Sequence, residues 1–220
     1  MTLTDERQKI FKDFEVPDPP RIKKIVNFVH KHFKNLKGLN VLECGAAKGG
    51  LAETLFKQGA ACFAIDINPR TLPGVKVIQS DLNQGLPKFE CQFDIIFAGE
   101  LIEHLYDDVA FVKSCNPLLS PGGLFIATVP NLVFSFNRLR MLFGKMPMFA
   151  YNPCHYHIYT KKTVDKLLKD AGFSIIKFSS SHVAFSTRRH RVGRIFELIA
   201  DFLPTFGAHL IVYATKGDKL

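Results

Sequence analysis

The sequence predicts an α/β fold, in which a parallel β-sheet has helices packed on both of its faces. Short apolar segments alternate with segments of helical periodicity between residues 39 and 129, which is typical of this fold class. Acidic residues also stand at or just past the ends of four of these apolar segments, at the edge where ligands bind in parallel sheets. A chain of 220 residues can bury one full core, so we expect a single domain over residues 1–220.

Residues 1–38 are expected to form two helices ahead of the sheet. The first covers residues 4–14 and ends before the proline-rich segment 17–20, because proline cannot continue a helix. From residue 21 to 36, apolar side chains recur at three- and four-residue spacing. This spacing predicts an amphipathic helix, with Gly38 just beyond its end.

Seven strands are predicted after these two helices. They cover residues 39–45, 61–67, 75–81, 93–98, 124–129, 173–178 and 209–215, and helices are predicted at 49–58, 106–119 and 160–171. The first five strands and the acidic strand ends all fall within residues 39–131. We therefore assign residues 39–131 to the half of the domain that binds a cofactor.

Two segments interrupt the alternation, and we expect them to cap the site of a second substrate. Residues 132–159 are rich in aromatic, basic and methionine side chains, and residues 182–207 contain a predicted helix at 188–203 that opens with four arginines. Residues 131–220 carry 14 Lys and Arg against 5 Asp and Glu, whereas residues 1–130 carry 15 of each, so the whole net charge of +9 lies in the last part of the chain. An anionic substrate, a lipid headgroup or a nucleic acid would explain this asymmetry, and so would a solvated basic face.

The cysteines and the N-terminal segment predict a cytoplasmic protein, with peripheral membrane association as a further option. The five cysteines form no CxxC pair, which favours reduced thiols. The first 12 residues are charged and resemble no signal peptide, and no apolar run approaches the roughly 20 residues that span a bilayer. The segment Cys154–His157 has metal-binding residue types, but no second ligand cluster completes a site, so no metal is expected.

The segment Glu43–Gly50 predicts a strand, a tight turn and the start of a helix, a geometry that brings backbone N–H groups against a ligand. The small residues Gly45 and Ala47 allow the ligand to approach the backbone closely. A dinucleotide is one interpretation, with Asp66 about twenty residues further on for a ribose. Against it, a carboxylate at Glu43 would repel a pyrophosphate and would favour a ligand that carries a cationic group.

The pattern Glu43-x-Gly45-x-Ala47-x-Gly49 resembles motif I of the class I S-adenosylmethionine-dependent methyltransferases, in which an acidic residue precedes GxGxG. The resemblance covers residues 39–216 and points to the branch often labelled methyltransferase type 11 or 12. Further motifs follow in the order of that family: Ile65-Asp66-Ile67, Ser80-Asp81-Leu82, Phe93-Asp94-Ile95-Ile96, Glu103-His104-Leu105 and Leu119-Ser120-Pro121-Gly122-Gly123. Ala47 replaces the usual middle glycine and is small enough to keep the site. The resemblance implies a Rossmann-like three-layer sandwich, with a seven-stranded mixed sheet whose last strand is antiparallel.

The resemblance also implies S-adenosylmethionine as the cofactor and a set of residues that bind it. The loop would hold the methionine part, Asp66 the ribose hydroxyls, and Asp81 with Leu82 the adenine. The full implied set is Glu43, Gly45, Ala46, Ala47, Gly49, Asp66, Ile67, Asp81, Leu82, Gly99 and Glu100. The chemistry agrees, because this cofactor has no phosphate but offers a sulfonium, an ammonium and two ribose hydroxyls to carboxylate acceptors.

Methyl transfer from a sulfonium depends mainly on alignment, and a base is needed only when the acceptor must lose a proton. His157, His155 and His104 are the candidates for that base, with packing or capping roles open for each. The expected acceptor is a small or lipid-like molecule, an anionic one among the options. No specific nucleic acid is expected, because residues 98–101 lack the Asn/Asp-Pro-Pro-aromatic motif used on nucleobases and glutamine.

Two alternatives stay open beside the methyltransferase. A nicotinamide-dependent oxidoreductase would use the same glycine-containing turn for a dinucleotide. A regulator would bind S-adenosylmethionine without transferring its methyl group. The sequence does not indicate the oligomeric state.

Overall fold

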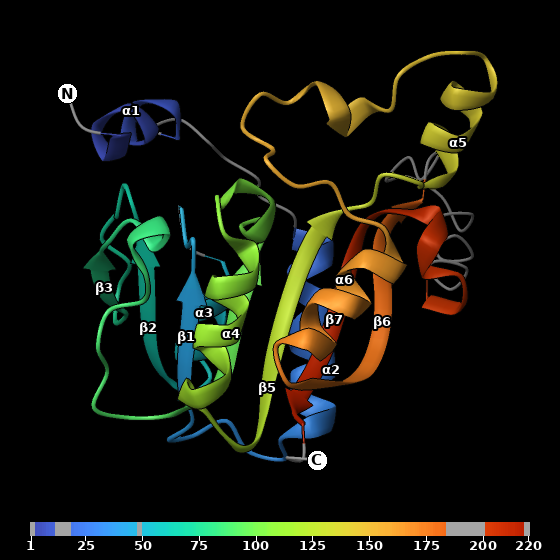
Figure 1. Cartoon of the computed structure of the whole chain (residues 1–220). Coiled ribbons are helices and arrows are strands. Elements are labelled where there is room, and N and C mark those ends of the chain that lie inside the picture. The colour runs from blue at the N-terminus through green and yellow to red at the C-terminus, as the bar shows by residue number, and fades with distance from the viewer. Residues whose placement is uncertain (1–2, 12–18, 48–49, 184–200, 218–220) are drawn as a thin grey trace.

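The computed structural model describes residues 3–11, 19–47, 50–183 and 201–217. In this part of the chain, seven strands form one sheet in the order β3-β2-β1-β4-β5-β7-β6 (Figure 1). Strand β7 runs antiparallel to both of its neighbours, and the other pairs are parallel. The predicted seven-stranded mixed sheet with an antiparallel last strand, in an α/β fold, is confirmed.

The elements alternate along the chain as the sequence predicts. The strands are β1 (Asn40–Cys44), β2 (Ala61–Asp66), β3 (Lys76–Gln79), β4 (Phe93–Gly99), β5 (Leu119–Pro130), β6 (Phe173–Val183) and β7 (Gly207–Lys216). The helices are α1 (Leu3–Ile10), α2 (Pro19–His32), α3 (Leu51–Phe56), α4 (Asp108–Leu118), α5 (Ser135–Leu142) and α6 (Lys161–Asp170). Four short 3₁₀ helices complete the described elements: η1 (Leu82–Gln84), η2 (Ile102–His104), η3 (Met148–Tyr151) and η4 (Pro204–Phe206).

Two layers of buried apolar side chains hold the helices against the sheet. On one face, Val112 of α4 and Leu168 of α6 belong to the same buried cluster as Phe125 of β5. On the other face, Ile25 of α2 and Leu55 of α3 share a cluster with strand residues. Neighbouring residues of a strand point to opposite faces, so the apolar runs of the central strands are buried on both sides.

The start of α2 differs from the prediction. Segment 17–20 was predicted to end the first helix, but Pro19 in this segment is the first residue of α2. Helix α2 also ends at His32, before the predicted end at Leu36. Proline suits the first turn of a helix because the N–H that it lacks has no partner there in any case. Gly38 (φ 83°) therefore lies in the turn between α2 and β1, where its N–H donates to the carbonyl of Gly59 at 3.1 Å.

Strands β5 and β6 are longer than predicted. Strand β5 already pairs with β4 at Leu119, and the register shifts before the pairing resumes at Leu124, so the residues between them form a bulge within the strand.

Segment 132–159, predicted as an insertion, contains α5 and η3. The helix predicted at 188–203 lies almost entirely outside the described residues, as does most of the predicted insertion 182–207.

Two segments lie at the edge of the sheet where its parallel strands end. Helix α1 lies beyond the ends of β1 and β2, and the chain that follows β5 runs through α5 along the same edge (Figure 1). This arrangement places an N-terminal helix and the segment 132–159 beside the predicted cofactor loop. None of the helices in the described ranges has both the length and the apolar character needed to cross a membrane.

The packing of β1 gives a direct test of the fold. Leu42 is fully buried in the central strand, so we expect Leu42→Ala to lower the free energy of unfolding by about 2–5 kcal/mol through lost burial and an unfilled cavity. Leu142 on α5 is 78% exposed, and Leu142→Ala should change this free energy by no more than about 0.5 kcal/mol. Urea unfolding of both variants measures the difference, and equal effects would contradict the described packing.

Candidate functional site

A pocket of about 580 Å³ opens at the carboxyl ends of the strands, beneath α1. Its wall is formed by Arg7, Phe11, Gly45, Ala47, Asp66, Ile67, Ser80, Asp81, Leu82, Glu100, Leu101, His104 and Leu105. Seven of the predicted cofactor contacts are among them: Gly45, Ala47, Asp66, Ile67, Asp81, Leu82 and Glu100. The structure thus brings together side chains from four different strand ends, as expected for a parallel sheet.

Glu43 organises the loop from below and does not line the pocket. Its carboxylate is buried and accepts hydrogen bonds from the backbone N–H of Ala52 at 2.8 Å and of Leu51 at 3.4 Å. The sequence interpretation placed this carboxylate against a cationic ligand. In the structure it instead caps the N-terminus of α3, where unpaired N–H groups favour an acceptor. A direct contact between Glu43 and a cofactor stays a prediction.

Ala47 lies at the turn of the loop in the left-handed region, with φ at +46°. A glycine would adopt this conformation with less strain, which is why the family motif has glycine there. The N–H of Ala47 donates to Oδ2 of Asp66 at 2.8 Å, and Oδ1 of Asp66 accepts from the N–H of Asn68 at 2.7 Å. The Asp66 carboxylate is therefore held at the end of β2 by two backbone donors.

Three other predicted contacts lie outside the pocket wall or outside the described residues. Ala46 is buried, and its N–H donates to the carbonyl of Ile65 at 3.1 Å. Gly99 is covered by the ring of Phe97, which would lie only 2.4 Å from a Cβ at this position. Gly49 is not among the described residues.

Glu100 is fixed at the end of β4 by three neighbours. Its carboxylate forms an ion pair with Arg21 of α2 at 2.8 Å and accepts a hydrogen bond from Thr128 at 2.9 Å. Nε2 of His209 lies 3.5 Å from its other oxygen. Its backbone is left-handed, with φ at +50°, a strained conformation that persists only where the surroundings impose it.

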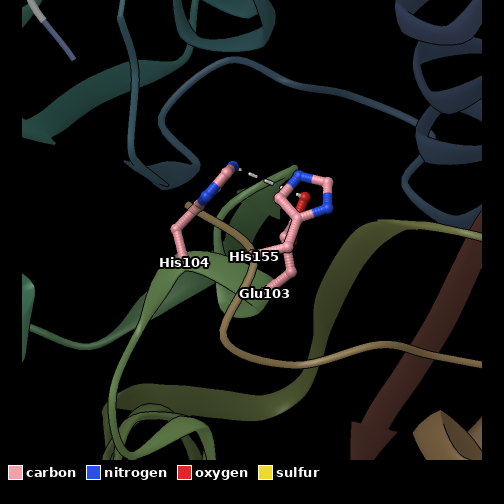
Figure 2. A group of neighbouring side chains, drawn as sticks. All are labelled: Glu103, His104 and His155. Carbon is pink, nitrogen blue, oxygen red and sulfur yellow. Dashed lines mark ion pairs between the residues drawn. The ribbon is translucent and has the colours of Figure 1, made fainter. Parts of the chain in front are cut away.

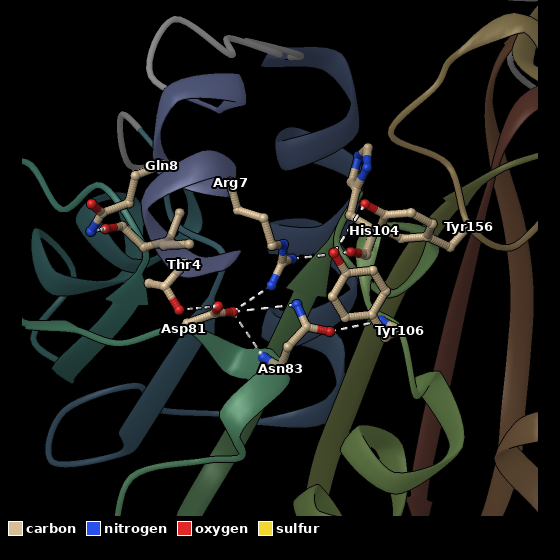
Figure 3. Close-up of polar contacts among 9 residues, drawn as sticks. Thr4, Arg7, Gln8, Asp81, Asn83, His104, Tyr106 and Tyr156 are labelled. Carbon is tan, nitrogen blue, oxygen red and sulfur yellow. Dashed lines mark hydrogen bonds and ion pairs between the residues drawn. The ribbon is translucent and has the colours of Figure 1, made fainter. Parts of the chain in front are cut away.

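Helix α1 covers the pocket through contacts that the sequence does not reveal. Arg7 forms a buried ion pair with Asp81 at 2.5 Å and donates to the backbone carbonyl of His104 at 3.1 Å (Figure 3). Thr4 also donates to Asp81, at 3.1 Å. On the outer side, the side-chain amide of Gln8 donates to the backbone carbonyl of Ile67, and the backbone carbonyl of Gln8 accepts from the side-chain amide of Asn68. These contacts hold α1 across the ends of β2 and β3.

The wall contains residues that sequence reasoning missed. They are Arg7, Phe11, Ser80, Leu101 and Leu105. A helix at residues 4–14 was predicted, but nothing in its local pattern indicates where it packs. Ser80, Leu101 and Leu105 could have been predicted from the sequence, because they lie beside or within motifs already identified there.

The three candidate bases take different positions. His104 lines the pocket, and burial lowers the pKa of its imidazole to about 4. His155 lies behind it with the two ring centroids 4.8 Å apart, and burial also lowers the pKa of His155. His157 points toward the segment that follows η2, where its Nε2 lies 3.3 Å from the carbonyl of Tyr106. His104 alone of the three lines the pocket.

Residues 18–177 match the family described as methyltransferase domain, so the chain belongs to that family. Class I S-adenosylmethionine-dependent methyltransferases are thereby confirmed as its class, with S-adenosylmethionine as the cofactor of the class. The nicotinamide-dependent oxidoreductase considered for the loop has no support from this assignment.

Known relatives agree with the family. A probable S-adenosylmethionine-dependent methyltransferase of Mycolicibacterium smegmatis is 28% identical over 144 residues, which cover 63% of this chain and 53% of that protein. A ubiquinone biosynthesis O-methyltransferase of Methylocella silvestris is 31% identical over 136 residues, covering 52% of this chain and 53% of that protein. The chain thus spans about half the length of these curated relatives.

A solved structure shows the same fold over nearly its whole length. The magnesium protoporphyrin IX methyltransferase of Synechocystis, determined with bound S-adenosylhomocysteine, superimposes with a TM-score of 0.62 at 18% identity. The match covers 97% of this chain and 94% of that one. At this identity the likeness establishes the fold.

The residues of the pocket fit S-adenosylmethionine. The carboxylates of Asp66 and Asp81 can accept from hydroxyl and amine groups, while Ile67 and Leu82 offer apolar surface for an adenine. Gly45 (φ 72°) has no Cβ to narrow the site, and a Cβ there would come within 3.0 Å of Leu101. The wall therefore combines close backbone approach with acceptors and apolar contacts.

The burial of Glu43 predicts a pH effect on stability. Burial raises the pKa of this carboxyl from 4.5 to about 7, so the folded protein keeps a proton on it that the unfolded chain releases. The free energy of unfolding contributed by this group therefore falls as pH rises from about 4.5 to about 7, by roughly 1.4 kcal/mol per unit at most. Glu43→Gln does not titrate and keeps a carbonyl acceptor for Ala52.

We accordingly expect Glu43→Gln to gain stability relative to the wild type across this pH window. Urea unfolding of both proteins at several pH values measures the difference between their free energies of unfolding. A difference that stays constant from about pH 4.5 to about pH 7.5 would show that the carboxyl is not perturbed in this way.

Proposed function

We propose that this chain transfers a methyl group from S-adenosylmethionine to a hydroxyl oxygen of a small or lipid-like acceptor. The observation that carries the proposal is the pocket in which Asp66 and Asp81 face the same space as His104. The ubiquinone biosynthesis O-methyltransferases among its relatives support an oxygen acceptor. Because the chain matches about half of those proteins, the acceptor is proposed from chemistry and not transferred by name.

The bound cofactor would supply a methyl group already activated by its sulfonium sulfur. The task of the chain is then to align the acceptor and to exclude water. Asp66, fixed by the N–H groups of Ala47 and Asn68, offers its remaining lone pairs to the ribose hydroxyls. Phe11 and Leu105 close the wall with apolar surface, and α1 shields the pocket from solvent.

A hydroxyl acceptor must lose its proton during the transfer, and His104 is the histidine in the pocket wall. Its Nδ1 lies 2.8 Å from the carbonyl of Cys154, so Nδ1 carries the proton and Nε2 the lone pair. A pKa of about 4 keeps this imidazole neutral near pH 7 but makes it a weak base. His155 stays a second candidate behind it. His157 faces Tyr106 and Asp108, which favours a structural role.

The segment 132–159 is proposed as the cap over the acceptor. The rings of Phe149 and His209 pack in a tilted arrangement with their centroids 5.6 Å apart, and His209 contacts Glu100 in the pocket wall. The segment therefore continues from the pocket wall to the outer surface of the molecule. An acceptor with an apolar tail could extend along it while its reactive end stays in the pocket.

The outer part of this cap has the composition of a membrane-binding surface, which supports a lipid-like acceptor. The apolar side chains of Leu139, Leu142, Phe143 and Met146 are exposed, and Arg138, Arg140 and Lys145 are interleaved with them; we call these seven residues the α5 surface. Exposed apolar groups beside basic ones favour adsorption to anionic lipid. We propose that the α5 surface touches an anionic membrane from which the acceptor enters.

Turnover of labelled S-adenosylmethionine tests the proposed activity. We expect transfer of label to the oxygen of phenolic acceptors, at higher kcat/KM for those with an apolar tail. His104→Ala should lower kcat by about 10-fold or more, in the range of general-base effects, while S-adenosylhomocysteine affinity changes less. His30→Ala, an exposed position on α2, serves as the control.

Binding of S-adenosylhomocysteine without transfer to any phenolic or lipid-extract acceptor would refute the proposed activity. That result would favour the regulator that the sequence leaves open. Transfer to nitrogen or carbon with no label on oxygen would keep the enzyme class but refute the acceptor atom.

Vesicle co-sedimentation tests the α5 surface. The wild-type chain should bind phosphatidylglycerol-containing vesicles at low salt, and Leu142→Ser with Phe143→Ser should weaken binding about 10-fold or more, because two exposed apolar contacts are lost. Val109→Ser removes an exposed apolar side chain from α4 and should leave binding unchanged. Absence of wild-type binding to anionic vesicles would refute the membrane proposal.

A further inference from the structure

Glu103 is a buried carboxyl that the proposed methyl transfer does not use. It lies in η2, directly before the pocket residue His104, and is only 1% exposed. Neither of its carboxylate oxygens has a hydrogen-bond partner within the described residues. Burying a carboxyl without such partners costs several kcal/mol. The charge of Arg21, which is paired with Glu100, offsets part of this cost without forming a hydrogen bond, and a proton or a second cation would offset more.

The loop that follows η3 brings a second histidine to this carboxyl. The N–H groups of Tyr156 and His157 donate to the backbone carbonyl of Glu103, at 2.8 Å and 3.2 Å. Nδ1 of His104 bonds to the carbonyl of Cys154. These three bonds fasten the loop to η2 and place His155 beside both residues (Figure 2).

The three side chains converge on one point. Glu103, His104 and His155 each offer one ligand atom, and these atoms all lie within 4.8 Å of one another. Around a tetrahedral ion with bonds of about 2.1 Å, donor atoms are roughly 3.4 Å apart. The three groups therefore have to approach one another by about an ångström or more to coordinate one ion.

The state of His104 suits coordination. Since its Nδ1 donates to a backbone carbonyl, its Nε2 holds the lone pair and points toward Glu103, with 3.8 Å between Nε2 and Oε1. In metal-binding histidines, one ring nitrogen usually coordinates the ion while the N–H of the other donates to an acceptor such as a backbone carbonyl.

A protonated Glu103 is the competing explanation, and burial does raise the pKa of this carboxyl well above its usual range. A carboxylic acid, however, would donate to the Nε2 lone pair at hydrogen-bond distance, and 3.8 Å is too long for that bond. It would also leave the second oxygen unsatisfied. A cation between the carboxylate and the two rings would satisfy both groups at once.

We propose that Glu103, His104 and His155 bind a divalent transition-metal ion of the zinc type. Two imidazoles and one carboxylate are a common ligand set for Zn²⁺, and three protein ligands leave a coordination position open. Nε2 of His155 accepts from the Asn152 side chain at 3.0 Å, so coordination through this atom would displace that amide. The sequence predicts no metal at residues 154–157, because the ligands that complete the set come from fifty residues earlier.

Of the three proposed ligands, His104 belongs to the pocket wall, so an ion bound to it would adjoin the pocket. Given the proposed function, an ion bound to Nε2 of His104 would occupy the lone pair that otherwise serves as the base. It would instead bind the acceptor oxygen and lower the pKa of its hydroxyl. The metal site itself does not depend on that function. It can be measured in the absence of any methyl acceptor.

Metal titration of the chelator-treated protein tests the proposal. Zn²⁺, in competition with a chromophoric chelator, should bind with a stoichiometry of one, and Co²⁺ should give the visible absorption of a four- or five-coordinate ion. Glu103→Gln and His155→Ala should each weaken Zn²⁺ binding at least 10-fold, within the range for loss of a ligand. His157→Ala, in the same loop, should leave the affinity unchanged.

Several outcomes would overturn the proposal: no one-to-one binding, Zn²⁺ affinity that is equal in the wild type and Glu103→Gln, or equal losses in His157→Ala. Circular dichroism checks that each variant is folded, and if His155→Ala does not fold, Glu103→Gln decides. S-Adenosylhomocysteine binding and methyl turnover are measured separately. A protein that binds Zn²⁺ but transfers no methyl group would retain the metal site and refute the proposed function.

Discussion

The site depends on the hydrogen bonds between the carboxylate of Glu43 and the first N–H groups of α3. Glu43 is the penultimate residue of β1, and Ala52 lies in the first turn of α3, so this contact ties the end of the strand to the start of the helix. The intervening loop can then place the N–H of Ala47 on Asp66 at the next strand end. One buried carboxylate thus positions another that faces the pocket. The backbone of Ala47 is in the left-handed region, and the hydrogen bond from its N–H to Asp66 helps to hold it there.

The same edge of the sheet carries two further layers of organisation. Arg7 of helix α1 forms an ion pair with Asp81. The family resemblance assigns the carboxylate of Asp81 to the adenine. This ion pair holds α1 over the pocket, where Arg7 and Phe11 of the N-terminal segment form part of the wall. On the other side, Glu100 connects α2, β5 and β7 through Arg21, Thr128 and His209. The pocket is therefore framed by charged pairs that are themselves buried.

The sequence predicts the sheet well because each strand is a short apolar run with turn residues after it. It also predicts Asp66, Asp81 and Glu100 in the wall, since the carboxyl ends of parallel strands meet at one edge. It does not give the direction in which a carboxylate points, and so the hydrogen bonds from the backbone N–H groups of Leu51 and Ala52 to Glu43 were not predicted. A contact between Glu43 and the cofactor stays a prediction. A local pattern carries the identity of a residue but not the rotamer that its neighbours select.

Contacts between distant segments were beyond prediction for a related reason. The packing of α1 on the pocket and the meeting of Glu103 with His155 both join segments separated by about fifty residues or more, and no periodicity encodes such pairs. The start of α2 at Pro19 was missed because a proline run marks the start of a helix as readily as the end of one.

The central claim is that one pocket binds S-adenosylmethionine, and that this pocket is formed by the loop after β1, the end of β2 and the start of η1. Calorimetric titration of the wild-type chain with S-adenosylhomocysteine and with NAD tests it most directly. The account predicts one-to-one binding of S-adenosylhomocysteine and none of NAD, with binding weakened at least 10-fold by Asp66→Asn, as expected for loss of a charged acceptor, and unaffected by Asp165→Asn on the exposed face of α6. Binding of NAD alone, or equal S-adenosylhomocysteine affinity in Asp66→Asn, would contradict it.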